Sequence, residues 1–154
     1  MPKASVKRLI ECNKKDLIDL VLDIEKYPEF VPFCFDAKIY ENHNEGDLTK
    51  IIADLTIGKG LFKDTYKSDV VFNKKEDSIF VKNIEGPLNH LSNNWTFIDK
   101  KNGITEVTFD IDFEIKNKFL NSLMVVSFQF GLEKIADAFQ KRAEELFDSS
   151  KNKI

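Results

Sequence analysis

Alternating hydrophobic and polar residues between Phe35 and Ile115 limit the fold of this chain more than any other feature. In the clearest segment, residues 107, 109, 111, 113 and 115 are apolar and the residues between them are polar. Such alternation indicates strands with one dry face and one wet face. Turn residues separate the segments near 42–46, 58–60, 74–77, 86–87 and 101–103. The chain is therefore predicted to contain an antiparallel meander covered on one side. The dry-face residues expected from the earlier segments are Ile51, Ala53, Leu55, Ile57, Phe62, Tyr66, Val70, Phe72, Leu91, Trp95 and Phe97.

A proline-free stretch from about Asn117 to Phe147 is predicted to form one long C-terminal helix. At ~100° per residue its apolar residues form one broad stripe, as expected of a helix that lies on a sheet. The stripe comprises Leu120, Met124, Phe128, Gly131, Ile135, Ala138, Phe139 and Leu146. The opposite face of the second half carries Glu133, Asp137, Gln140, Lys141 and Glu144. We predict one α+β domain over residues 1–154, with a curved antiparallel sheet wrapped around the helix.

The first half of this helix also carries a second apolar stripe, formed by Phe119, Leu123, Val126 and Phe130. Three explanations are open. In the first, the stripe contacts a membrane peripherally and a ligand is loaded there. In the second, the segment from Tyr27 to Phe33 covers the stripe. In the third, a second copy of the chain covers it.

The N-terminal part is predicted to form a strand from Ala4 to Cys12 and a helix from Asp16 to Ile24, capped by Asn13. Two prolines between Tyr27 and Phe33 forbid a long helix there, so a short helical turn or compact loop is expected. No apolar run approaches the ~18 residues of a membrane span. The protein is expected to be cytoplasmic, with peripheral contact to the inner membrane left open.

Charge and cysteine usage narrow the class of partner. The net charge is −3, and only Arg8 and Arg142 supply guanidinium groups, so DNA binding is not expected. Cys12 and Cys34 form no CxxC pair and fit no zinc spacing. We interpret them as reduced, buried thiols.

A catalytic or metal-binding set is not recognisable. His43 and His90 lie in predicted loops without metal-ligand spacing, and no nucleophile motif is present. Alternation places Asp110, Asp112 and Glu114 on the wet face, which predicts a solvated surface. The sequence therefore predicts no catalytic residue, no metal site and no enzyme. A curved sheet and a straight helix diverge and enclose apolar space, and the 14 phenylalanines suit an apolar or aromatic occupant.

Four stretches, spread over about residues 5–147, resemble the coenzyme Q-binding family of the START-like superfamily. They are YPEFVPFC at 27–34, FKDTYKSDV at 62–70, a third stretch over 86–97, and AFQKRA at 138–143. The third stretch consists of GPL at 86–88, Leu91, and WTF at 95–97. Bacterial members of this group are described as polyketide cyclase/dehydrase-type lipid-transport proteins or as ribosome-association toxins.

The resemblance implies a helix-grip fold that holds ubiquinone or a related isoprenoid and supports respiratory electron transfer. Two alternatives remain: a toxin that binds a ribosomal subunit and blocks subunit joining, and a polyketide cyclase, for which only His90 can be nominated. The residues predicted to line the cavity are Tyr66, Val70, Trp95, Phe97, Phe109, Phe113, Met124, Phe128 and Ile135. Tyr66 and Trp95 are the predicted donors to a quinone carbonyl.

Overall fold

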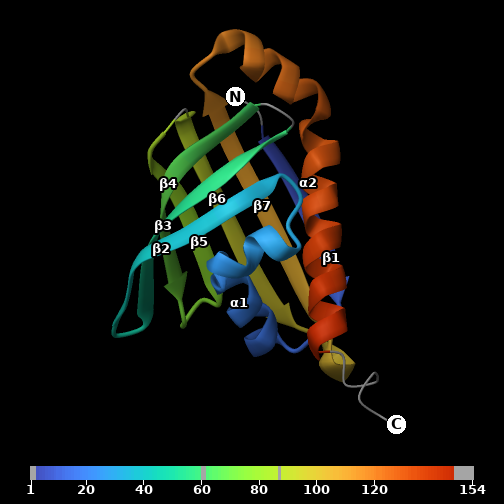
Figure 1. Ribbon diagram of the computed structural model, residues 1–154. Helices are drawn as coiled ribbons and strands as arrows, with labels where there is room; N and C mark the ends of the chain where they lie inside the picture. The colour runs from blue at the N-terminus through green and yellow to red at the C-terminus, as the bar shows by residue number, and fades with distance from the viewer. Residues whose placement is uncertain (1–2, 60–61, 87, 148–154) are drawn as a thin grey trace.

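A seven-stranded antiparallel sheet curls beside one long helix (Figure 1). The computed structural model describes residues 3–59, 62–86 and 88–147, with side chains described for these except at 59, 62, 88, 89, 115 and 120–128. The elements are β1 (Lys3–Ile10), α1 (Lys14–Leu22), the 3-10 helix η1 (Ile24–Glu29), β2 (Cys34–Glu45), β3 (Leu48–Lys59), β4 (Phe62–Asn73), β5 (Ser78–Glu85), β6 (Leu88–Asp99), the short 3-10 turn η2 (Lys101–Gly103), β7 (Thr105–Ile115) and α2 (Lys118–Phe147).

Strand order in the sheet is β1-β7-β6-β5-β4-β3-β2, so β2 to β7 form a meander and β1 joins the end of it. The register places Trp95 opposite Phe109 and Asn94 opposite Asp110, which keeps apolar residues on one face and polar residues on the other. Helix α2 runs along the side of the sheet formed by β1 and β7 (Figure 1). This arrangement confirms the predicted fold class.

The connection between β1 and β2 follows its local sequence signals. The Asn13 side chain accepts a hydrogen bond from the Asp16 backbone N–H at 2.9 Å, so Asn13 caps α1 as predicted. The apolar face of α1 is buried in the core, and η1 supplies the short helical turn expected around Pro28. Cys12 and Cys34 are buried free thiols, which confirms that prediction.

Two of the predicted core positions with described side chains are wrong, and the side chains of Phe62 and Leu120 lie outside the described residues. Ile57, near the end of β3, is 38% exposed, although its partner Cys34 on the edge strand β2 is buried. Leu146 is 50% exposed, because the buried row of α2 continues through Phe139, Ala143 and Phe147 and leaves Leu146 at its margin. Leu132, which the predicted stripe omitted, is buried at 2% exposure.

Candidate functional site

The inner face of the sheet, which is turned toward α2, contains most of the residues predicted to line a cavity. Five of them are buried there: Val70, Trp95, Phe97, Phe109 and Phe113. Tyr66 and Ile135 are partly buried. The side chains of Met124 and Phe128 lie outside the described residues. The lining role of all nine residues stays a prediction.

Trp95 lies at the centre of a packed aromatic cluster. Its ring centroid is 4.3 Å from that of Phe109 and 5.2 Å from that of Phe139, and its ring stacks nearly parallel to Phe97. Phe139 also meets Tyr27 and Phe30 edge-on, at centroid distances of 5.4 Å and 5.1 Å. Edge-to-face contacts of this kind stabilise a core beyond their buried area. Trp95 therefore packs the sheet against α2, independently of any role in lining a ligand cavity.

The void beside this cluster is small. Its volume is about 20 Å³, space for about one water molecule. It is lined by Val6, Arg8, Ile10, Leu17, Trp95, Val107, Phe109, Ile135, Ala136 and Phe139. The second half of α2 thus packs closely on the sheet, and no ring-sized ligand fits at this position. A larger ligand would require a different part of the inner face.

Farther along that face, polar side chains interrupt the apolar wall. Ser68 on β4 is 1% exposed, and its hydroxyl oxygen has no hydrogen-bond partner. Asn83 lies opposite Ser68 on β5, and its Oδ1 accepts a hydrogen bond from the Leu91 backbone N–H at 2.8 Å. Asn93 on β6 has a buried Oδ1 atom without a partner. Buried polar atoms without partners are rare and destabilising, so this group is the strongest candidate site.

Sequence reasoning missed these residues, although the sequence contains a signal for them. Ser68 lies between Tyr66 and Val70, and Asn93 between Leu91 and Trp95, at positions where the alternation requires an inward side chain. A polar residue in an apolar register marks a core position that needs a partner.

Tyr66 lies beside Ser68 on β4 and interacts with Cys34 on β2, and both groups are neutral at physiological pH. Burial raises the pKa of the Tyr66 phenol to about 12. The nearby Ser68 hydroxyl lowers this pKa by a smaller amount, although the geometry between the two groups is not that of a hydrogen bond. Burial also raises the pKa of the Cys34 thiol to about 11. Neutral donors of this kind can bind an oxygen-bearing ligand, but they are poor acids, bases or nucleophiles at pH 7.

Gly86 explains one of the motifs noted in the sequence. Its φ angle is +140°, and a Cβ atom built there would lie 2.7 Å from the Cβ and 2.9 Å from the Cα of Tyr66. Only glycine tolerates both the backbone angle and the close approach. The glycine therefore sets the position of Tyr66 on the inner face.

Two other motifs meet in space although they lie more than 100 residues apart. Glu29 Oε1 accepts a hydrogen bond from an Arg142 terminal nitrogen at 3.0 Å, and the Arg142 guanidinium lies 5.1 Å from the Phe30 ring centroid. Together with the contacts of Phe139, these interactions attach η1 to α2. Both motifs thus serve to close the fold around the core.

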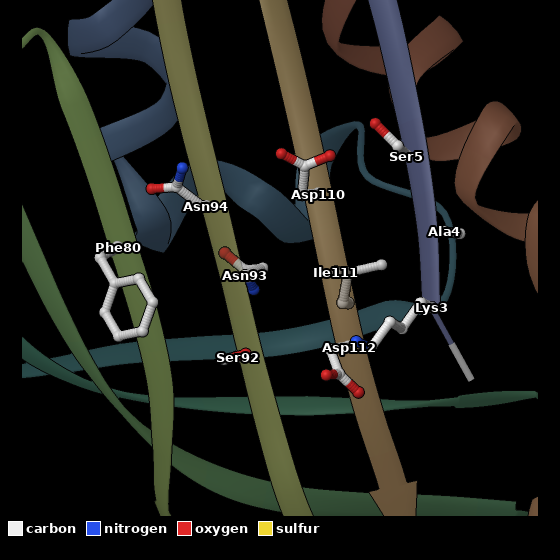
Figure 2. A pocket seen from close by; sticks show the side chains of 10 residues that line it. All are labelled: Lys3, Ala4, Ser5, Phe80, Ser92, Asn93, Asn94, Asp110, Ile111 and Asp112. Carbon is white, nitrogen blue, oxygen red and sulfur yellow. The ribbon is translucent and has the colours of Figure 1, made fainter. Parts of the chain in front are cut away.

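The opposite face of the sheet carries a separate, open depression of about 430 Å³ (Figure 2). It is lined by Lys3, Ala4, Ser5, Phe80, Ser92, Asn93, Asn94, Asp110, Ile111 and Asp112. Asp110 is exposed there as predicted, whereas Asp112 and Glu114 are partly buried. His90 lies on this face, with Nε2 3.8 Å from Asp112 Oδ2, and is directed away from Leu91 and Phe113. His43 is exposed beside Glu45.

The second apolar stripe of α2 reaches solvent at both ends. Phe119 is 71% exposed and Phe130 is 62% exposed, with the Lys134 ammonium 4.6 Å from the Phe130 ring centroid. The side chains of Leu123 and Val126 lie outside the described residues. None of the helices in the described part of the chain combines the length and apolar composition needed to cross a bilayer.

A curled sheet that holds a long C-terminal helix is a helix-grip fold. A START superfamily protein from Mycobacterium smegmatis has the same fold, with a TM-score of 0.80 at 19% identity over 94% of this chain and 98% of that one. Residues 15–140 match the family described as polyketide cyclase / dehydrase and lipid transport, and the chain belongs to this family. The resemblance seen in the sequence is thereby confirmed.

Two relatives of this chain carry names that describe different functions. The chain is 33% identical to the ribosome association toxin RatA of Rickettsia prowazekii, over 90% of this chain and 94% of that protein. It is 32% identical to the mitochondrial coenzyme Q-binding protein COQ10 of Dictyostelium discoideum, over 85% of this chain and 63% of that protein. The chain therefore spans less than two thirds of the second relative.

Proposed function

We propose that the protein binds a hydrophobic small molecule, ubiquinone or a related isoprenoid, and carries it in support of respiratory electron transfer. The observation that carries this proposal is the composition of the inner face. From 66 to 70, 79 to 83, 91 to 97 and 107 to 113, the inward residues of β4 to β7 are apolar or neutral, and none is charged. Burial of a prenyl tail at ~25 cal/mol per Å² supports micromolar binding. The coenzyme Q-binding relative supports the choice of ligand.

A second candidate is association with a ribosomal subunit. It is favoured by the Rickettsia relative, which matches this chain over nearly its whole length and is named as a ribosome association toxin. With a net charge of −3 and two arginines, the chain is poorly equipped to bind RNA phosphates. We rank this candidate below quinone binding.

One preparation tests both candidates. Protein purified from membranes and cytosol without detergent is extracted with organic solvent and analysed by mass spectrometry, and part of it is sedimented with ribosomal subunits at low and high salt. We expect an isoprenoid quinone to co-purify and the protein to remain unbound by ribosomes. Salt-sensitive sedimentation with one subunit, without any bound quinone, would support the second candidate instead.

The proposed carrier is not an enzyme. A cyclase needs an acid or base inside the cavity with its pKa near the working pH. Among the described residues, the inward groups Tyr27, Tyr66 and Cys34 have pKa values raised by burial, and His90 lies on the other face. These features support binding without chemistry.

We further propose that the carrier works in the cytoplasm and loads its ligand at the inner membrane through the second apolar stripe. A quinone does not cross water freely, and exposed aromatic rings near the first half of α2 would enter the bilayer interface. Replacing Phe119 and Phe130 with serine is expected to slow quinone uptake from liposomes at least ~5-fold. Affinity for the quinone in detergent should not change.

The matched control is Leu146→Ser, because Leu146 is 50% exposed on the same helix but lies near its other end. Its uptake rate should equal that of the parent. If the double variant takes up quinone at the parental rate, loading does not use this stripe. Dissociation of a dimer would assign the stripe to a second copy.

A further inference from the structure

The buried hydroxyl of Ser68 lies near the Tyr66 phenol but has no hydrogen-bond partner within the described part of the chain. It is 1% exposed and makes no hydrogen bond, although a serine at this position is surrounded by core residues. Burial of a hydroxyl without a partner destabilises the folded protein, and alanine would avoid this cost. The Ser68 side chain therefore presents a donor and an acceptor in the interior of the protein.

Asn93 provides a second such group two strands away. Its Oδ1 atom is inaccessible and unpartnered, and its neighbours on the same face, Leu91 and Trp95, are both buried, although the residue also borders the depression on the outer face. Strands β4 and β6 are separated by β5, which is roughly 10 Å in the hydrogen-bonding direction. Asn93 is level with Val81 and Val70, two residues along β4 from Ser68, so the two side chains face each other diagonally across β5. A ring with oxygens on opposite edges can bridge such a span, with hydrogen bonds of about 2.8 Å at each end. Val70 and Val81 fill the adjacent inner-face positions with apolar surface.

The chemistry of these two side chains selects the type of head group. A serine hydroxyl and an asparagine amide can each donate and accept hydrogen bonds, so they serve a carbonyl or a hydroxyl equally. The inward residues of β4 to β7 named above include no cation that could neutralise a carboxylate or phosphate. An ionic head group would therefore be buried without a counter-charge at this position, which is strongly unfavourable.

We propose that Ser68 and Asn93 form an interior polar seat for an uncharged ring that bears carbonyl or hydroxyl groups. The ligand enters with its head group first, and its isoprenoid tail follows the apolar wall toward the first half of α2. This inference rests on the proposed function, and it restricts the ligand to neutral quinone-like lipids. Fatty acids and phospholipids are excluded as ligands of this seat.

The test measures binding of a short-chain ubiquinone, squalane and oleate to the full chain. For Ser68→Ala and Asn93→Leu we expect quinone affinity to fall roughly 3–10-fold each. The melting temperature of ligand-free Ser68→Ala should be unchanged or a few degrees higher, because the unpartnered hydroxyl is gone. A group with a merely structural role would lower it. Ser92→Ala on the outer face of β6 is the matched control and should bind as the parent does.

The possible outcomes are distinguishable. If the parent binds neither quinone nor squalane, the proposed function fails. If the parent binds quinone but both variants bind it equally well, the function stands and the polar seat is wrong. Oleate binding as tight as quinone binding would also overturn the inference, because it requires an ionic head group in this interior.

Discussion

Replacing Trp95 with alanine is expected to lower the free energy of unfolding by about 3–5 kcal/mol. Trp95 is 9% exposed, contacts Phe97, Phe109 and Phe139, and borders a void of only about 20 Å³. The truncated side chain would leave a cavity between the sheet and α2 that the surrounding aromatic rings cannot close. Urea denaturation followed by circular dichroism measures the loss.

The control is Phe80→Ala, which removes an aromatic ring from the outer face, where Phe80 is 46% exposed. It should cost less than about 1 kcal/mol. The sequence predicted Trp95 as a wall of the ligand cavity, and that role is still a prediction. A Trp95→Ala variant of nearly parental stability that no longer binds quinone would contradict the core assignment and favour the cavity wall.

Replacing Gly86 with alanine is expected to destabilise the protein by about 2–5 kcal/mol, since two costs act together. The backbone angle of +140° is unfavourable for any residue with a Cβ, and that Cβ would approach Tyr66 to 2.7 Å. Because the contacts are with the Cβ and the backbone of Tyr66, no side-chain rotation relieves them. Strands β4 and β5 must separate locally, and Tyr66 must move from its position on the inner face.

Gly46→Ala separates these two costs. Gly46 also has a positive φ, +60°, but no atom lies within 4 Å of the position of its new Cβ. It should lose only about 1–2 kcal/mol, from the backbone angle alone. Thermal and urea unfolding of both variants measure the difference. Equal losses would show that Gly86 is required for its backbone angle and not for its closeness to Tyr66.

Local periodicity was sufficient to predict the fold. Alternation over β7 placed Val107, Phe109 and Phe113 on the buried face, and the proline-free stretch placed α2 within one residue of its observed start. The Asn13 cap was also predictable, because its hydrogen bond to Asp16 spans three residues. These features depend only on neighbours along the chain, so the sequence contains them directly.

The candidate site was only partly predictable. The inward positions of Val70, Trp95 and Phe113 follow from alternation, but the division of the inner face into a closely packed part and a polar part does not. That division depends on how closely α2 approaches each strand. The approach is set by the packing of Phe139 against Trp95, and no period in the sequence encodes it.

The sequence by itself determined which residues form strands and helices and which face of each is apolar. The tertiary structure alone decided that Arg142 binds Glu29 across 113 positions, that Gly86 contacts Tyr66, and that the Ser68 hydroxyl is buried without a partner. The physical reason is that secondary structure follows from interactions between near neighbours, whereas burial and hydrogen-bond satisfaction depend on elements that meet only after the chain has folded.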